Sequence, residues 1–348
     1  MTPILIAGGA GYIGSHCARI LREAGYHCII YDNLSEGHRE AVRGFTLVEG
    51  ELSDTALLCD VMERHGICAV LHFAAFALVG ESMKDPLAYY QNNIGGTASL
   101  LTAMRDAGVG RLVFSSTCAT YGEDVPVPIT EDVPQRPCNP YGESKLYVES
   151  LLRRSDAAYG IKSVSLRYFN AAGAMPDGSI GEAHRLETHL IPLVLKAALR
   201  EKAASGAAMT GLVRGGGGIE SGLRVYGTDY PTPDGSAIRD YIHVLDLAQA
   251  HLLALRYLED GGETDVFNLG TGRGHSVLEV IDCARKVTGR AIMYEEAARR
   301  PGDPPVLVAA ADKAQAVLGW VPERSDLESI IKDAWGWHES HPGGYAYK

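Results

Sequence analysis

The sequence lacks the features of proteins that span membranes, bind nucleic acid or depend on disulfide bonds. None of its apolar runs approaches the roughly 20 residues that cross a bilayer. Its 32 Lys and Arg residues are outnumbered by 43 Asp and Glu residues, and the net charge of −11 argues against a nucleic-acid partner. The seven cysteines are odd in number and contain no Cys-x-x-Cys pair, so we expect free thiols in a reducing cytoplasm.

Signals for export and for metal binding are also scarce. Residues 1–7 have no basic region and form an apolar run that is typical of a strand, so we expect no signal peptide. His338 and His341 have a spacing that suggests a pair of metal ligands, but histidines so spaced near a terminus are usually solvated. We therefore expect no metal site.

What the chain does have is a long alternation of apolar runs with helical patterns. Up to residue 170 this alternation predicts a parallel sheet with crossover helices. The expected strands cover residues 3–7, 27–31, 45–48, 69–73, 111–115 and 162–167. Asp85 before Pro86 predicts the start of a long helix that ends near Ala107. Segment 202–222 is rich in small residues, which predicts a flexible surface insertion. We expect the insertion itself to cover residues 203–222.

A glycine-rich turn directly follows the first expected strand. Gly8, Gly11 and Gly14 have the spacing that allows a tight turn, a close approach of pyrophosphate and close packing of the next helix. The N-terminus of that helix would face the phosphates. Asp32 lies 18 residues after Gly14 at the end of the second strand, where a carboxylate accepts from an adenosine ribose and repels a 2′-phosphate. The pattern therefore predicts NAD rather than NADP as the cofactor.

Tyr141 and Lys145 lie four positions apart on an expected helix, so their side chains share one face. A free tyrosine loses its proton near pH 10, and a nearby ammonium group favours the phenolate. Lowering the tyrosine pKa to near neutrality takes roughly 3 units, about 4 kcal/mol, to which the lysine and the positive nicotinamide would contribute. With 17 tyrosines in the chain this spacing also arises by chance, so its meaning depends on the glycine-rich turn upstream.

Together and in this order, the motifs resemble the extended short-chain dehydrogenase/reductase superfamily over nearly the whole chain. The resemblance implies an α/β protein with a Rossmann doubly wound parallel sheet and a smaller C-terminal α/β substrate domain. It implies an NAD-binding domain over residues 1–172 and a UDP-sugar-binding domain over 173–348, of which segments such as 236–272 pack back on the first. The cofactor-binding residues that it implies are Gly8, Gly11, Tyr12, Ile13, Gly14, Asp32, Asn33, Leu34, Ser35, Glu51, Leu52, Phe73, Ala74, Ala75, Asn92, Thr117, Tyr141, Lys145 and Phe169.

Several segments resemble the UDP-glucose 4-epimerase family in particular: 79–82, 166–170, 188–192, 226–235, 238–244 and 300–303. The resemblance implies a homodimer that interconverts UDP-glucose and UDP-galactose with NAD. Tyr141 would take the proton of the sugar 4-hydroxyl, Lys145 would keep Tyr141 ionised, and Thr117 would hydrogen-bond the reacting oxygen. The 4-keto sugar would then turn and be reduced on its other face. The substrate-binding residues so implied are Thr117, Tyr141, Asn170, His189, Leu190, Val225, Tyr226, Arg239, Arg300 and Asp303.

Three other functions remain open from the sequence. An epimerase of UDP-GlcNAc/GalNAc or of UDP-xylose/UDP-arabinose uses the same chemistry, and Leu307, at the position associated with N-acetylated sugars, does not decide between them. A nucleotide-sugar dehydratase or oxidoreductase is disfavoured, because dehydratases place an Asp-Glu pair where this chain has Cys118 and Ala119. A non-catalytic dinucleotide sensor is disfavoured because Tyr141 and Lys145 are both retained. Galactose catabolism and polysaccharide precursor supply are both compatible with the sequence.

Some residues also have purely structural interpretations or depart from the family pattern. Ion pairs of Arg239 with Asp240, or of Arg300 with Asp303, are the structural alternatives to diphosphate binding. Asp246 is expected to be the N-cap of the following helix. The family's Ser is replaced by Thr117, its adenine-contacting Asp by Glu51, and a cofactor-binding Lys of some relatives by Ala77.

Overall fold

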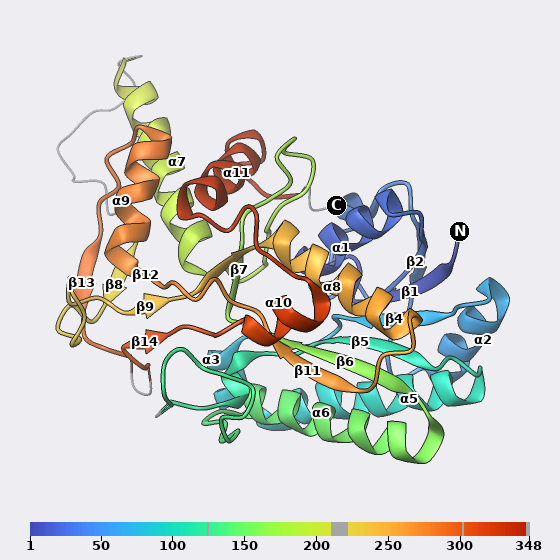
Figure 1. Ribbon diagram of the computed structural model, residues 1–348. Coiled ribbons are helices and arrows are strands. Elements are labelled where there is room, and N and C mark those ends of the chain that lie inside the picture. Colours follow the sequence, from blue (N-terminus) through green and yellow to red (C-terminus); the bar gives the residue numbers. More distant parts are fainter. Residues whose placement is uncertain (124, 210–221, 301–302, 346–348) are drawn as a thin grey trace.

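The computed structural model describes residues 1–123, 125–209, 222–300 and 303–345, and a seven-stranded parallel sheet lies at its centre (Figure 1). Its strands are β1 (Pro3–Ala7), β2 (His27–Asp32), β3 (Thr46–Glu49), β4 (Ala69–His72), β5 (Arg111–Ser115), β6 (Lys162–Arg167) and β11 (Asp265–Asn268). The six expected strands are confirmed, with small shifts at their ends. The order β11-β6-β5-β4-β1-β2-β3 changes direction between β1 and β4, which is where doubly wound sheets bind ligands.

Helices cover both faces of this sheet (Figure 1). One face carries α1 (Tyr12–Glu23) and α8 (Val244–Glu259), and the other carries α2 (Thr55–His65), α5 (Gly96–Asp106) and α6 (Pro140–Tyr159). Successive residues of β1 divide between the two layers, because side chains alternate across a strand. Ile4 and Ile6 pack with α1 and α8, whereas Leu5 and Ala7 pack with the other helices. The doubly wound Rossmann architecture is thus confirmed.

The second half of the chain forms smaller sheets and a separate group of helices. β7 (Asn170–Ala172) pairs with β10 (Tyr241–His243), β8 (Arg224–Tyr226) pairs with β13 (Glu295–Ala297), and β9 (Ile238–Arg239) lies between β12 (His275–Ser276) and β14 (Val306–Leu307). Helices α7 (Leu190–Met209), α9 (Val277–Thr288) and α11 (Leu327–Ser340) pack on one another, while α10 (Asp312–Leu318) packs on α8. The division of the chain at residue 172 stays a prediction, because β11 and α8 come from the second half and lie in the layers of the central sheet.

The helix expected from Asp85 to Ala107 contains a wider turn. Asp85 caps it as expected, because its side chain accepts a hydrogen bond from the Ala88 amide at 3.1 Å. The first turn, α4 (Pro86–Tyr89), continues into the π-helix η2 (Tyr90–Gly95) and then into α5. A helical segment is therefore present as predicted, but it is not α-helical throughout. The short helix α3 (Val79–Lys84) precedes it.

The expectation for Asp246 is wrong. His243 is the N-cap of α8, and its Nδ1 accepts from the Leu245 amide at 3.1 Å. The Asp246 carboxylate instead accepts from the amides of Glu323 and Arg324, at 3.1 and 2.9 Å. These partners are far away in sequence, so a local capping pattern gives no sign of them.

The insertion expected at 202–222 is only partly within the described residues. Helix α7 extends to Met209, so the backbone of residues 202–209 is helical rather than irregular, which corrects that part of the prediction. Residues 210–221 lie outside the described residues.

The structure also describes the cysteines and the lengths of the helices. All seven cysteines lie within the described residues, and all seven are free, as predicted. Within the part of the chain that the structure describes, no helix is both long enough and apolar enough to cross a bilayer.

Candidate active site

Thr117, Tyr141 and Lys145 come together where β5 ends and α6 begins. Thr117 follows β5 and starts the short helix Cys118–Thr120. Tyr141 lies in the first turn of α6, which begins after the capping residue Asn139. The Thr117 hydroxyl lies near enough to the Tyr141 phenol to lower its pKa, and the Lys145 ammonium lies 6.0 Å from the centroid of the Tyr141 ring. A phenol, a hydroxyl and an amine are thus adjacent, as the sequence predicted.

Burial dominates the acid–base properties of this group. Lys145 is 3% exposed, and its Nζ donates to the Ser115 carbonyl at 2.7 Å. Because burial disfavours the ammonium, the pKa of Lys145 falls to about 7. Burial raises the pKa of Tyr141 to about 12, against the opposing effect of the Thr117 hydroxyl. The Lys145 ammonium faces the Ser115 carbonyl, and burial is the largest influence on the Tyr141 pKa. That Lys145 and the nicotinamide together keep Tyr141 ionised stays a prediction.

The glycine-rich turn has the shape that a phosphate group requires. Gly8 has φ of +76°, and a Cβ atom there would lie 2.4 Å from the Ala74 amide nitrogen. A Cβ atom on Gly14 would lie 2.4 Å from the Gly8 carbonyl oxygen, so α1 packs directly against the turn. At Gly11 a Cβ atom would meet only the Gly8 oxygen, at 3.4 Å. The turn is closed toward the protein by Gly8 and Gly14 and leaves room at Gly11, at the N-cap of α1.

Asp32 connects this turn with the loop that follows β2. Its carboxylate oxygens accept from the amide of Ala10 at 2.9 Å and from the amide of Leu34 at 2.8 Å. Burial raises the pKa of Asp32, and the two amide hydrogen bonds oppose that shift. Within the same loop the Asn33 amide group donates to the Glu51 carboxylate at 3.0 Å. Glu51, longer than the residue of the family pattern, is thereby held against the loop.

A pocket of about 590 Å³, open to solvent, lies beside the turn at the carboxyl ends of β1, β2 and β4. The expected cofactor-binding residues that line it are Gly8, Gly11, Asp32, Asn33, Ser35, Glu51, Leu52, Phe73, Ala74, Ala75 and Asn92. The lining residues that the sequence reasoning missed are Tyr31, Glu36, Gly37, Gly50 and Phe76. Each missed residue lies within two positions of an expected one, so a wider window around each motif would have included them.

The π-helix η2 joins this pocket to the Tyr141 helix. Asn92 lines the pocket, and its amide donates to the Asn93 side chain at 2.9 Å. Asn93 is buried and bonds the backbone of Phe76 on one side and the Ser144 hydroxyl, at 2.9 Å, on the other. The sequence singled out Asn92 but missed Asn93, for which the adjacent asparagine was the available signal. π-Helical turns occur often at functional sites, because the extra residue redirects side chains.

The residues expected to bind a nucleotide sugar come from several separate segments. Val225 is buried in β8, and the guanidinium of Arg300 lies over the ring of Tyr226, 4.2 Å from its centroid. Asn170 donates to the Asp240 carbonyl at 3.0 Å. His189 precedes α7, whose first residue is Leu190. Arg300 and Tyr226 are thus brought together, although 74 positions separate them in sequence.

The ion pairs expected as structural alternatives are not the ones that form. Arg239 pairs with Asp303 rather than with Asp240. The Asp240 carboxylate accepts instead from the amides of Thr271, at 3.0 Å, and Ala309, at 3.3 Å. Two residues expected to bind the diphosphate and the ribose therefore contact each other, which holds the Arg239 guanidinium in a fixed position.

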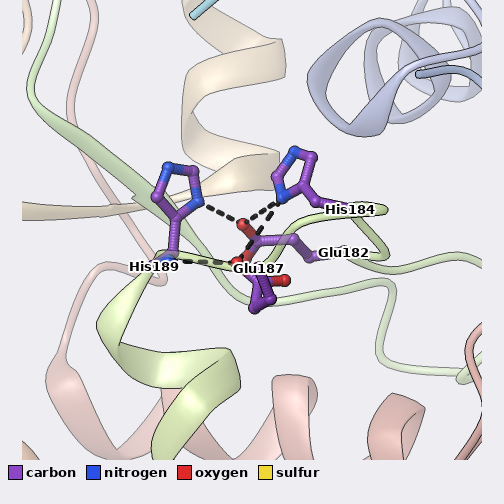
Figure 2. Close-up of side chains that lie close together, drawn as sticks. All are labelled: Glu182, His184, Glu187 and His189. Atoms are coloured by element: carbon purple, nitrogen blue, oxygen red, sulfur yellow. Dashed lines mark hydrogen bonds and ion pairs between the residues drawn. The ribbon is translucent and has the colours of Figure 1, made fainter. Parts of the chain in front are cut away.

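His189 also belongs to a cluster that the sequence reasoning missed. Glu182, His184, Glu187 and His189 bring their nitrogen and carboxylate oxygen atoms within 4.8 Å of one another (Figure 2). Their occurrence within eight consecutive residues was the available signal. Conversely, His338, expected to be solvated, is buried at 4% exposure, and burial lowers its pKa to about 4.

Comparisons with known proteins give consistent findings. The model of the NAD dependent epimerase/dehydratase family matches residues 4–270. The UDP-glucose 4-epimerase of Lacticaseibacillus casei is 49% identical over 343 residues, which are 98% of each chain. The UDP-glucose 4-epimerase of Brucella ovis, solved in complex with NAD, is 48% identical with a TM-score of 0.88, covering 96% of this chain and 98% of that one. That of Bifidobacterium longum, solved with NAD+ and UDP, is 36% identical with a TM-score of 0.87, covering 99% and 100%.

Proposed function

The chain belongs to the NAD dependent epimerase/dehydratase family, and from this premise we propose that it interconverts UDP-glucose and UDP-galactose. The reaction is an oxidation at C4 of the sugar, a rotation of the 4-keto sugar and a reduction on its other face. One observation carries the proposal from the family to this chemistry: Thr117, Tyr141 and Lys145 are adjacent, and the residues after Thr117 are Cys118 and Ala119 rather than carboxylates. With no acid–base pair at that position, water elimination has no support.

NAD is the cofactor, and the chain's own residues fit it. The open side of the glycine-rich turn at Gly11 and the N-terminus of α1 would hold the pyrophosphate. Asp32 would accept from the adenosine ribose, with Asn33, Leu34 and Ser35 in the same loop, and Glu51 and Leu52 would line the adenine side. When bound, NAD supplies the site that accepts the C4 hydrogen with its electron pair and later returns it.

Tyr141 is proposed as the acid–base group. As a phenolate it takes the proton of the 4-hydroxyl, and as a phenol it returns a proton when the keto sugar is reduced. The Thr117 hydroxyl lies near the Tyr141 phenol, so it can hold the reacting sugar oxygen. Lys145, fixed by the Ser115 carbonyl, supplies positive charge beside the phenol.

The pKa of Tyr141 should depend on the cofactor. With a pKa raised to about 12 by burial, the phenol stays protonated at neutral pH in protein stripped of nucleotide. A positive nicotinamide nearby favours the charged phenolate, so the pKa should fall by about 1–3 units when NAD is restored. Ultraviolet absorbance titration of the wild-type protein, with the curve of Tyr141→Phe subtracted, measures this change. Identical titration curves with and without NAD would contradict the proposed role.

The nucleotide of the substrate is proposed to bind between β8, β9 and the residues before β14. Val225 and Tyr226 would contact uracil, and Arg239 and Arg300 would neutralise the diphosphate, for which guanidinium groups are well suited. Asp303 would accept from a ribose hydroxyl. The remaining proposed contacts come from Phe169, on the cofactor, and from Asn170, His189 and Leu190, on the sugar nucleotide.

Leu307 is proposed to limit the size of the sugar. Leu307 and Phe169 both pack against a buried cluster that includes Cys118, the residue after Thr117. Leu307→Ala should therefore enlarge the sugar site and raise kcat/KM for UDP-GlcNAc relative to UDP-glucose by about tenfold, a typical effect of a few methylene groups. Leu307→Met, which conserves volume, is the matched control and should leave the ratio unchanged. An unaltered ratio in Leu307→Ala would place the limit elsewhere.

A homodimer in the cytoplasm is proposed for the assembled protein. The helices α3, α4 and α6 present large apolar side chains to solvent, with Met83 63%, Leu87 68% and Tyr147 58% exposed. A second copy of the chain would cover this face, and light scattering in solution measures its presence. The seven free cysteines support a reducing compartment, and a role in galactose metabolism follows from the proposed substrates.

The experiment that tests the proposed reaction uses the purified protein without added NAD. It is incubated separately with UDP-glucose, UDP-GlcNAc and UDP-xylose, and the products are resolved by chromatography. UDP-glucose should be converted to UDP-galactose until the two sugars reach equilibrium, because the cofactor is regenerated in each cycle. Accumulation of a keto sugar, or of reduced cofactor in proportion to product, would instead indicate a dehydratase or an oxidoreductase.

A further inference from the structure

The side chains of Glu182, His184, Glu187 and His189, in the segment that precedes α7 in sequence, point toward one another (Figure 2). His184 Nδ1 lies 3.2 Å from a carboxylate oxygen of Glu182 and 3.6 Å from one of Glu187. His189 Nδ1 contacts the same Glu182 oxygen. Two imidazole nitrogens and two carboxylates from one short segment therefore face a common point.

These distances suit ligands around an ion. Bonds of about 2.0–2.1 Å to a tetrahedral zinc ion leave neighbouring ligand atoms about 3.3 Å apart. The two distances from His184 Nδ1, 3.2 and 3.6 Å, lie on either side of that value, and the longer one exceeds the range of an ordinary hydrogen bond. Of the Glu187 carboxylate, Oε2 is buried with no hydrogen-bond partner, and the nearest cation, Lys196 Nζ, lies 3.8 Å away.

The charges of the cluster also call for a cation. The Glu182 and Glu187 side chains are only 4% and 5% exposed, and Lys196, paired with Glu187 at 3.8 Å, compensates only one of their two negative charges. One divalent ion with two neutral imidazoles makes the set neutral as a whole. Two protonated histidines could also neutralise the carboxylates. That would place two cations side by side, because the ring centroids of His184 and His189 lie 5.1 Å apart.

We infer that Glu182, His184, Glu187 and His189 form a binding site for a divalent transition-metal ion of the zinc class. Imidazole nitrogens prefer such ions, whereas Mg²⁺ prefers all-oxygen sites and an octahedral shell. The site goes beyond the proposed epimerase reaction, shares His189 with the proposed sugar-nucleotide contacts, and differs from the sequence-based expectation of no metal. It borders the cofactor region, because the ring of His184 lies 6.4 Å from that of Tyr12 in the glycine-rich turn.

The test measures binding of Zn²⁺ alone to the full-length protein. Because Cys68 and Cys138 are exposed thiols that would bind zinc by themselves, all samples carry Cys68→Ser and Cys138→Ser. After treatment with chelator and dialysis against micromolar Zn²⁺, about one zinc ion per chain should remain by elemental analysis. Zn²⁺ should also raise the thermal unfolding midpoint, and Mg²⁺ at the same concentration should not.

Variants assign the ion to the cluster. His184→Asn and Glu187→Gln should each lower the affinity for Zn²⁺ at least tenfold. His275→Asn removes a histidine that faces one carboxylate, of Glu279, at 3.8 Å, and it should bind zinc like the parent. The inference is overturned if the parent retains no zinc, or if His184→Asn binds as tightly as the parent. Should the cluster variants fail to fold, anomalous X-ray scattering at the zinc edge decides, because the peak must lie between these four side chains.

Discussion

Tyr141→Phe is expected to lower kcat by about 10²–10⁴-fold while UDP-sugar binding stays nearly unchanged. The substitution removes the phenol that lies near Thr117 at the end of β5, and proton transfer by a positioned side chain contributes rate factors of that size. The ring remains, so the packing at the start of α6 should be retained. Steady-state assay of UDP-glucose conversion measures the loss, and calorimetric titration with UDP measures binding.

Tyr159→Phe is the matched control for this substitution. Tyr159 is the last residue of the same helix, α6, and is 57% exposed. The same chemical change there should leave kcat within about twofold of wild type, because the ring lies outside the site. A Tyr141→Phe enzyme that retained more than about a tenth of wild-type kcat would require a different acid–base group.

Glu149→Gln is expected to destabilise the folded protein by about 3–5 kcal/mol. Glu149 and Arg167 form a buried ion pair, with side chains 0% and 3% exposed. Arg167 donates to both carboxylate oxygens, Nε to one at 2.9 Å and Nη2 to the other at 2.6 Å, and the Ser116 hydroxyl donates to the first at 2.6 Å. The amide leaves the buried guanidinium without a countercharge, and the free energy of unfolding, measured with urea, should fall accordingly.

Asp60→Asn is the control for charge removal at an exposed pair. Asp60 and Arg64 lie one turn apart on α2, with side chains 50% and 66% exposed. Surface pairs of this kind contribute little, so the free energy of unfolding should change by less than about 1 kcal/mol. If Glu149→Gln were as mild as Asp60→Asn, the buried pair would contribute no more to stability than a surface pair.

The parts of the fold that local sequence specifies were predictable. The six strands through residue 167 are apolar runs between turns, and all six are found. The N-cap of Asp85 was also predictable, because its partner lies three residues away. Asp246 was misassigned because its hydrogen-bond partners lie more than 70 residues later, and no local pattern reports them. The π-helical turn after Tyr89 was missed because helix propensity does not distinguish a wider turn.

The candidate site divides in the same way. The spacing of Tyr141 and Lys145 is a local property, and it correctly brought both side chains to one face of α6. Their pKa values were not predictable, because these depend on burial and on the direction of the Lys145 ammonium, which faces Ser115. The pairing of Arg239 with Asp303 likewise joins residues 64 positions apart. The sequence suggested a nearer partner for each, Asp240 for Arg239 and Arg300 for Asp303.

The π-helix Tyr90–Gly95 has a consequence for how the chain tolerates insertions and deletions. In a regular α-helix each side chain is rotated by about 100° from the one before it. A π-helical turn contains one extra residue, which changes the rotation between the side chains before it and those after it. Asn92 can therefore face the pocket, while Leu100 and Met104, in the α-helix α5 that continues the same segment, face the core. Loss of a single residue here would rotate Asn92 and the capped start of the helix away from the cofactor while leaving α5 in place. A single residue of the π-helix thus sets the rotation of the pocket-facing side chains relative to the core-facing side chains of α5.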